Sequence, residues 1–243
     1  MATVEIETVS GSISAYRAEP QGEVAGAVVL IHEVWGLVPH IIDVADRLAA
    51  EGYLVVAPDI LSRAGVDPVI GAELQRLMFS ADDAERAEAQ PRMREALSTA
   101  NSPEYAEWAV GALAGVVDHL EGQLERMASV AVVGFCFGGS YAWALAAADP
   151  RVRLTVPFYG SPPEHAELGS VQGRVLAFYG ETDDRVTSTL AATADALEET
   201  GTEFASVVYP GVGHAFFNDT NPVTYDEAAA TDAWAKLLAE LAR

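Results

Sequence analysis

One cysteine lies in a pattern typical of a catalytic nucleophile. Residues 134–139 read Gly-Phe-Cys-Phe-Gly-Gly, which places Cys136, the only cysteine, between a predicted strand and a predicted helix. A Gly-x-nucleophile-x-Gly segment in that context forms a sharp turn, and small flanking residues allow the chain to pack closely around it. The N-terminus of the helix is expected to lower the pKa of the thiol, and the Phe137 N–H to donate to an oxyanion. We therefore favour a nucleophile over a buried structural cysteine.

A thiol nucleophile needs a base, and two histidines follow Cys136 in the chain. His214 ends the segment Gly-Val-Gly-His, directly after an apolar run that predicts a strand. It should therefore lie on a loop at the carboxyl edge of the sheet, where open α/β sheets place their sites. His165 follows Ser-Pro-Pro-Glu and is expected to be a solvated loop residue. The sequence favours His214 as the base.

The carboxylate that orients the base is expected between the nucleophile and the histidine in chain order. Residues 180–186 read Gly-Glu-Thr-Asp-Asp-Arg-Val and follow another predicted strand. Spacing alone does not separate Asp183 from Asp184, and Glu181 is a weaker third candidate. The order cysteine, acid and His214 is that of the α/β-hydrolase fold.

Glu33 is a further acidic residue at a predicted strand end, within the segment Leu-Ile-His-Glu-Val-Trp-Gly at 30–36. This strand should neighbour the strand before Cys136, which would bring Glu33 close to the thiol. A helix-capping or solvated carboxylate is an equal alternative on residue type alone. No third ligand follows His32 and Glu33 at metal spacing, so we expect neither a metal nor a cofactor.

The elements that must position these residues alternate between strands and helices, which predicts right-handed crossovers and a mostly parallel sheet. The first 17 residues instead predict an antiparallel hairpin at the sheet edge, and the helices should cover both faces. We expect one domain over 1–243, with residues 62–101 as a candidate cap-like insertion. The strands are predicted at 27–31, 53–57, 130–134, 154–158, 175–178 and 204–209, and the helices at 39–51, 103–124, 138–148, 188–200 and 222–242, with weaker helical periodicity at 74–78 and 84–97.

Composition excludes several classes of function. The chain has 243 residues, half of them hydrophobic, and 36 acidic against 14 basic side chains give a formal net charge of −22. Such a surface repels nucleic acid and anionic membranes, and it fits either a GC-rich coding sequence or tolerance of high salt. There is no signal-peptide pattern and no long apolar run. We expect a cytoplasmic monomer without disulfide bonds.

These motifs together resemble the dienelactone hydrolase (carboxymethylenebutenolidase) family of α/β-hydrolases. The resemblance covers nearly the whole chain, and cysteine in the elbow together with the early glutamate separates this family from serine hydrolases. The matching segments are His-Glu-Val-Trp-Gly-Leu at 32–37, Ala-Pro-Asp at 57–59, the 134–139 segment, Gly-x-x-Asp-x-x-Val at 180–186 and Gly-His-x-Phe at 213–216.

The resemblance implies a role for each site residue. It assigns Cys136 as nucleophile, Asp183 as the acid and His214 as the base. It implies that the backbone N–H groups of Val34 and Phe137 form the oxyanion hole. The glutamate of the family holds the resting thiol and moves aside when substrate binds, and Glu33 matches it.

The sequence also departs from the family pattern. The best-known members bind a substrate carboxylate with two arginines, and Asn218 stands at one of these positions. Arg76 is a candidate for the other, and Trp35 is a further candidate substrate contact. A neutral or differently charged ester or lactone therefore becomes plausible as substrate.

We accordingly expect a cofactor-free cysteine hydrolase of small-molecule esters or lactones, acting through an acyl-enzyme. The alternative is a non-hydrolytic cysteine redox sensor or protein-quality factor built on a similar elbow, which would not need an ordered triad. A glutamine amidotransferase would also use Gly-x-Cys-x-Gly but expects glutamate two residues after the histidine, where Phe216 stands.

Overall fold

A single sheet of eight strands runs through the molecule. The computed structural model describes residues 2–123 and 129–243. The strand order is β1-β2-β4-β3-β5-β6-β7-β8, and every pair from β4 to β8 is parallel. The strands are β1 (Ala2–Thr8), β2 (Gly11–Ala18), β3 (Gly26–Ile31), β4 (Tyr53–Pro58), β5 (Val130–Phe135), β6 (Val152–Phe158), β7 (Arg174–Gly180) and β8 (Phe204–Tyr209).

The antiparallel hairpin predicted at the N-terminal edge is confirmed. Strand β1 pairs with β2 in antiparallel register, with Ile6 opposite Ile13. Strand β2 then pairs antiparallel with β4, which joins the hairpin to the parallel part of the sheet. Both isoleucines are buried, so the alternation in the sequence marks the face that packs against the protein.

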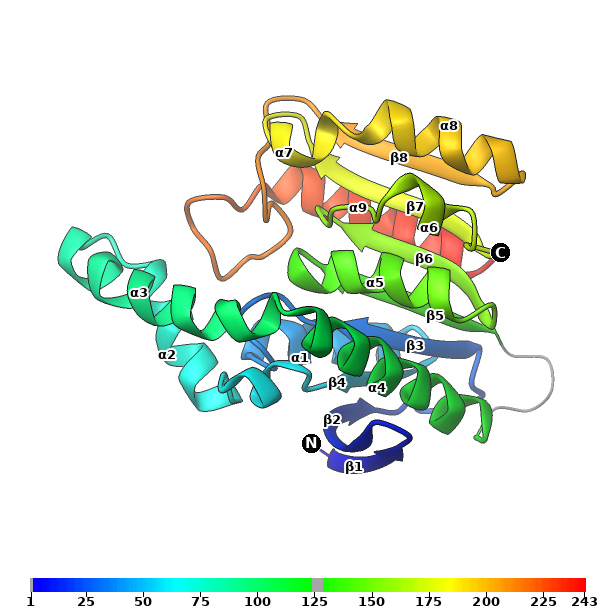
Figure 1. The fold of residues 1–243 in the computed structure, drawn as a ribbon, viewed down its shortest axis with the longest axis horizontal. Coiled ribbons are helices and arrows are strands. Elements are labelled where there is room, and N and C mark those ends of the chain that lie inside the picture. Colours follow the sequence, from blue (N-terminus) through cyan, green and yellow to red (C-terminus); the bar gives the residue numbers. More distant parts are fainter. Residues whose placement is uncertain (1, 124–128) are drawn as a thin grey trace.

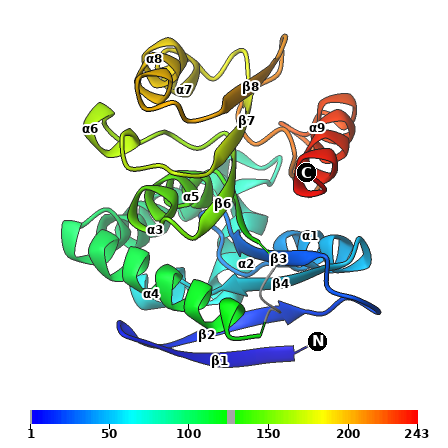
Figure 2. The ribbon, with the colours of Figure 1, turned by 90° about the vertical axis from the view of Figure 1, so that its right-hand side faces the viewer.

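Helices cover both faces of the sheet, as predicted (Figure 2). Helices α1 and α9 pack on one face, and α4, α5 and α8 on the other. The helices are α1 (Pro39–Ala50), the short 3₁₀ helix η1 (Leu61–Ala64), α2 (Pro68–Met78), α3 (Asp83–Ala100), α4 (Pro103–Glu121), α5 (Phe137–Ala148), α6 (His165–Leu168), α7 (Asp184–Thr187), α8 (Leu190–Thr200) and α9 (Glu227–Leu241).

The central strands are buried along their whole length because helices lie on both sides of them. Every residue of β3, β4 and β5 is buried, which explains their continuous apolar sequence. Their carboxyl ends, the arrowheads in Figure 1, meet at one edge of the sheet. The loops that leave this edge carry the candidate site residues.

The predicted start of the last helix is wrong by five residues. Helix α9 begins at Glu227, not at 222, because the Asp226 side chain caps it by accepting from the Ala229 N–H at 2.9 Å. The predicted helix over 103–124 ends at Glu121, and residue 124 lies outside the described residues.

Helices α2 and α3 fill most of the irregular stretch at 62–101. The Asp67 and Asp82 side chains cap the two helices, which explains how helices form where apolar periodicity is weak. Both helices lie beside the carboxyl edge of the sheet in Figure 1. The C-terminal end of α3 thereby reaches the site.

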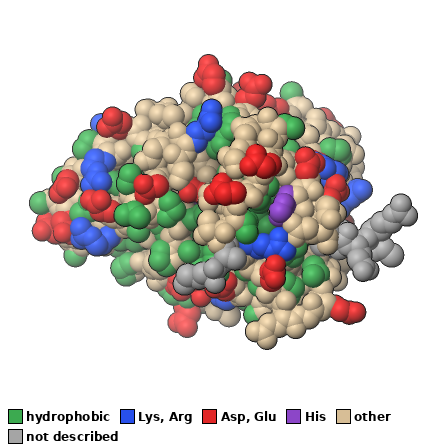
Figure 3. All heavy atoms as spheres, turned by 90° about the horizontal axis from the view of Figure 1, so that it is seen from below, with side chains coloured by type: hydrophobic (Ala, Val, Ile, Leu, Met, Phe, Trp, Pro, Cys, Tyr) green, Lys and Arg blue, Asp and Glu red, His purple; other side chains and the backbone are tan. Residues whose placement is uncertain are grey.

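Acidic side chains are spread over the face shown in Figure 3, with basic side chains between them. Within the described ranges, no helix is both long and apolar enough to cross a bilayer.

Candidate active site

Cys136 lies at the tight turn between β5 and α5, in a strained backbone conformation with φ 54°. The turn requires glycine on either side. A Cβ on Gly134 would lie 2.0 Å from the Gly138 carbonyl oxygen, and a Cβ on Gly138 would lie 2.2 Å from that of Ile31. The elbow predicted from residues 134–139 is therefore present, with its thiol at the carboxyl edge of the sheet.

His214 and Asp183 approach the thiol from two other strand ends. The Nδ1–H of His214 donates to Asp183 Oδ2 at 2.6 Å, since a carboxylate only accepts. That tautomer leaves Nε2 free to accept from the Cys136 thiol, and Nε2 lies 3.1 Å from Sγ. Cysteine, histidine and aspartate therefore form one hydrogen-bonded chain.

The geometry separates the acids that spacing alone did not. Asp183 is almost buried and contacts His214. Asp184 is exposed and begins α7. Glu181 is exposed and accepts from the Gly211 N–H. Of these three acids, only Asp183 hydrogen-bonds to the imidazole.

The expectation that the helix lowers the pKa of the thiol is wrong in direction. Burial raises the pKa of Cys136 to about 12, and the negative charge of Glu33 raises it further. The Phe137 N–H opposes this rise by hydrogen bonding to the sulfur. Desolvation of the buried sulfur is the largest of these effects and outweighs the stabilisation of the thiolate by the Phe137 N–H. The resting form is therefore a thiol that must lose its proton during attack.

Glu33 is buried beside this thiol and is held by two neutral donors. It is 2 % exposed. The Tyr159 hydroxyl donates to its Oε1 at 3.2 Å, and Asn218 Nδ2 donates to its Oε2 at 2.5 Å. Glu33 is thus neither a solvated carboxylate nor a helix cap. Asn218, which stands where the family pattern has an arginine, thus helps to fix the orientation of the Glu33 carboxylate.

Val34 and Phe137, the two residues expected to supply oxyanion donors, both lie beside the sulfur. The Phe137 N–H already contacts Cys136, as noted for its pKa. The Val34 N–H has no acceptor among the described residues. Both residues line the same cavity as Cys136. Two donors at one carbonyl position are what an oxyanion hole requires.

The cavity over Cys136 has a volume of about 460 Å³ and is mostly apolar. Several of the side chains that line it are small, among them Ala100, Ala106 and Ala144. Arg185, at the rim, is the one charged residue among those that line it. Its lining comes from the end of α3, from α4 and α5, and from Val34, and comprises Leu97, Ala100, Asn101, Ala106, Val110, Phe137, Ser140, Tyr141, Ala144 and Arg185 besides Val34 and Cys136.

Three residues considered from sequence lie outside this cavity. Arg76 is exposed on α2 and lies 3.3 Å from Glu85. Trp35 packs edge-on against Phe79 at the C-terminal end of α2, with ring centroids 5.3 Å apart. His165 is exposed, as expected for a solvated histidine.

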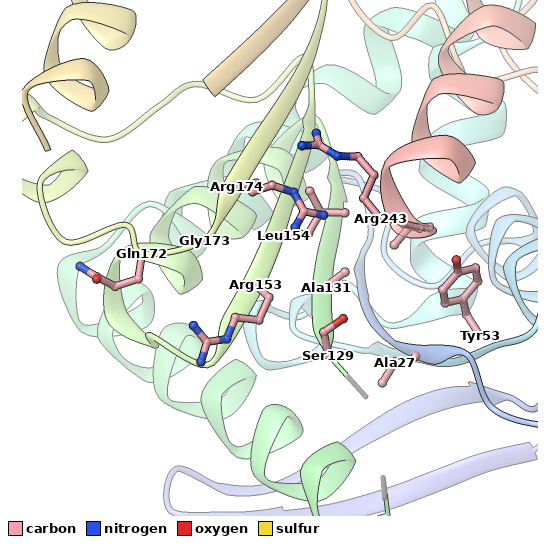
Figure 4. A pocket seen from close by; sticks show the side chains of 12 residues that line it. Ala27, Tyr53, Ser129, Ala131, Arg153, Leu154, Gln172, Gly173, Arg174 and Arg243 are labelled. Carbon is pink, nitrogen blue, oxygen red and sulfur yellow. The ribbon is translucent and has the colours of Figure 1, made fainter. Parts of the chain in front are cut away.

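A second pocket, of about 390 Å³, lies at the opposite, amino-terminal edge of the sheet (Figure 4). It contains three arginines, but Arg174 and Arg243 both pair with Glu240, at 2.8 and 2.9 Å. Arg153 points away from these two (Figure 4). The guanidinium groups therefore do not converge on a shared anion position, and this pocket is remote from Cys136. Within the described ranges, no group of three or more His, Cys, Asp or Glu side chains could hold a metal ion.

Sequence reasoning missed Tyr159 and Arg185 as parts of the site. Tyr159 directly follows β6 in a Phe-Tyr-Gly segment and has a φ of 41°, unusual outside glycine. This positive φ is visible only in the structure, so nothing in the sequence marked Tyr159 as part of the site. Arg185 stands next to the acids at 181–184, so its position in the loop was visible but its contact with the cavity was not.

Comparisons with known proteins find relatives that match nearly the whole chain. The sequence model of the "Dienelactone hydrolase family" matches residues 13–243. A Synechocystis sp. protein named "Putative carboxymethylenebutenolidase" is 31% identical over 250 residues, covering 96% of this chain and 93% of its own. One of the same name from Saccharolobus solfataricus is 28% identical over 252 residues, covering 95% and 94%.

Solved structures share the fold. A Klebsiella pneumoniae protein described as "Putative Dienelactone Hydrolase" superposes with a TM-score of 0.81 at 26% identity, covering 100% of this chain and 98% of that one. The dienelactone hydrolase from Anabaena variabilis, at 21% identity, gives a TM-score of 0.64 and covers 99% and 95%, a likeness of fold alone.

Proposed function

The chain belongs to the dienelactone hydrolase family and is a hydrolase of ester or lactone bonds, and from that premise we propose that Cys136 is its nucleophile. His214 acts as general base, and Asp183 orients the imidazole and stabilises its charged form. The observation that carries this proposal is the hydrogen-bonded chain from Sγ to Nε2 at 3.1 Å and from Nδ1 to Oδ2 at 2.6 Å.

Acylation begins with attack by the Cys136 sulfur on the carbonyl carbon of the substrate. The thiol proton passes to His214 Nε2 as the carbon–sulfur bond forms. The negative charge moves to the carbonyl oxygen, where the N–H groups of Val34 and Phe137 stabilise it. The intermediate collapses, and the imidazolium returns the proton to the departing alkoxide. A thioester on Cys136 remains, and a lactone alkoxide stays attached to its acyl chain.

Deacylation reverses the roles of the same groups. His214 Nε2 removes a proton from water, and the resulting hydroxide attacks the thioester carbonyl. The Cys136 sulfur leaves and regains its proton from the imidazolium, which releases a carboxylic acid. No oxidant, reductant or cofactor enters this balance.

The raised thiol pKa supports proton transfer coupled to attack. A sulfur with a pKa of about 12 is a thiol at neutral pH, so the base must act in the same step. This also argues against the redox-sensor alternative, because sensor cysteines react as accessible thiolates of low pKa.

The cavity favours neutral esters with an apolar chain. Its walls are mostly apolar and its volume is about 460 Å³. Its one cationic lining residue, Arg185, has a side chain that is 66% exposed, so solvent screens its charge. Asn218 stands where the family pattern has an arginine. Its amide donates to Glu33 and carries no positive charge that could bind a substrate carboxylate. A buried substrate carboxylate would lack a partner here.

Residues 62–101 act in this proposal as a cap that shapes the cavity. Leu97 and Ala100, near the end of α3, form part of its wall. The cap therefore takes part in selecting chain length, while the chemistry stays at the sheet edge.

Substrate preference is tested with p-nitrophenyl esters. Each buried methylene contributes about 0.8 kcal/mol, so kcat/KM should rise about fourfold per added CH₂ until the cavity is full. At equal length, p-nitrophenyl hexanoate should exceed mono-p-nitrophenyl adipate by about tenfold or more. Ala144→Leu should shift the optimum to shorter chains and leave the acetyl ester unaffected. Equal rates for the hexanoate and adipate esters would contradict the preference for neutral substrates.

The role of Cys136 is tested by Cys136→Ala. Removing the sulfur should abolish ester hydrolysis while the melting temperature stays near that of the wild type. Retained turnover in a folded Cys136→Ala protein would refute the proposal.

A further inference from the structure

His32 is a fully buried histidine next to the site. Its ring Nδ1–H donates to the backbone carbonyl oxygen of Glu33 at 2.7 Å, since a carbonyl only accepts. Its other nitrogen, Nε2, has no hydrogen-bond partner among the described residues. The ring is therefore neutral, and burial lowers its pKa, which keeps it so. It makes one directed hydrogen bond.

That bond fixes the direction of a peptide group in the proposed oxyanion hole. The carbonyl of Glu33 and the N–H of Val34 belong to one peptide plane, and in a trans peptide they point in opposite directions. The structure has no cis peptide bonds among its described residues. The same carbonyl also accepts from the Gly36 N–H at 3.1 Å. Two donors thus fix the direction of this carbonyl, and with it the direction of the Val34 N–H in the same peptide plane.

The same ring also contacts the second donor residue. The imidazole of His32 and the ring of Phe137 stack in parallel, with centroids 6.2 Å apart and planes 8° from parallel. Phe137 carries the N–H that hydrogen-bonds to the Cys136 sulfur. His32 therefore contacts both segments that carry the proposed oxyanion donors, the turn at residues 33–34 and the start of α5.

We propose that His32 is a positioning residue for the oxyanion hole: by holding the Glu33 carbonyl it aims the Val34 N–H at the carbonyl oxygen of the bound substrate. His32 does not itself touch the substrate and transfers no proton. This inference rests on the proposed function, because an oxyanion forms only if Cys136 attacks a carbonyl.

The test compares two variants of equal shape. Asn and Leu have nearly the same outline, but Asn carries a side-chain N–H at the position of Nδ1, and Leu does not. His32→Asn keeps the hydrogen bond to Glu33, and His32→Leu removes it. Both leave the same space where the rest of the ring was, so the loss of packing is matched between them.

His32→Leu should lower kcat for p-nitrophenyl butyrate about 10²-fold, the loss typical of one misdirected oxyanion donor. Its KM should change little, because the hole acts mainly in the transition state. His32→Asn should stay within about fivefold of the wild type, since it keeps a neutral hydrogen bond. Alkylation of Cys136 by iodoacetamide, which forms no oxyanion, should be alike in all three proteins.

Two results would overturn the inference. One is kcat within threefold of the wild type in His32→Leu, and the other is an equal loss in both variants, which would indicate packing alone. If His32→Leu does not fold, His32→Met replaces it, because methionine also lacks a side-chain N–H. The same loss of kcat is then expected, and the same two results would overturn the inference. An active wild type with equal variants refutes only the positioning role, whereas an inactive wild type refutes the proposed function as well.

Discussion

Alkylation of Cys136 by iodoacetamide, followed across pH, gives a quantitative test of how the site controls its sulfur. Burial and the Glu33 charge raise the pKa of this thiol from 9.0 to about 12. At pH 8 the thiolate fraction is then about 10³-fold smaller than that of an ordinary cysteine. The higher basicity makes the thiolate roughly 15- to 30-fold more nucleophilic. The net expectation is a rate roughly 30- to 60-fold below that of a cysteine peptide.

The rate should also rise about tenfold per pH unit up to pH 10 without levelling off, because it follows the thiolate fraction. Glu33→Gln removes the nearby negative charge and keeps the side chain's shape, so it should lower the pKa of Cys136 and speed alkylation at pH 8. Asp184→Asn removes an exposed charge at the start of α7 and should leave the alkylation rate unchanged.

A plateau below pH 8 would refute this reasoning, since it would reveal a thiolate already formed at rest. Equal alkylation rates in Glu33→Gln and the wild type would refute the part assigned to the glutamate. Melting temperatures of the variants check that the fold is kept.

Two further predictions follow from contacts of the elbow and the acid. Asp183→Asn should lower kcat by about 10²–10⁴-fold, with Asp184→Asn near the wild type, because only the first acid contacts the imidazole; equal effects in steady-state assays would contradict the assignment. Gly138→Ala should lower the free energy of unfolding by about 1–3 kcal/mol or more in thermal unfolding, because its Cβ would lie 2.2 Å from a backbone oxygen. The control Gly22→Ala should be neutral, because its Cβ would meet nothing within 4 Å.

Local patterns predicted the parts of the site that depend on neighbouring residues. The elbow around Cys136 could be predicted because the strand, the turn and the helix are each encoded within a few residues. The loop with His214 could be predicted because it follows an apolar run directly. Parallel strands end at one edge, so placing each residue after its strand already brought them together.

Other features depend on packing between distant segments. The contact that separates Asp183 from Asp184 depends on how the chain turns into α7, and these residues are adjacent in sequence. The thiol pKa depends on burial of the sulfur and on the charge of Glu33, and both result from packing between segments that no single motif encodes. The bond from Asn218 to Glu33 joins residues far apart in sequence, so it could not be predicted from either segment alone.

The covalent intermediate on Cys136 is the most direct test of the account. Wild-type protein is mixed with excess p-nitrophenyl butyrate, quenched in acid within milliseconds, and analysed by intact mass and peptide mapping. The account predicts an added butyryl group on the peptide that contains Cys136, formed with the first burst of p-nitrophenol and absent from Cys136→Ala. A burst of product with the acyl group on another residue, or no adduct during rapid turnover, would contradict it.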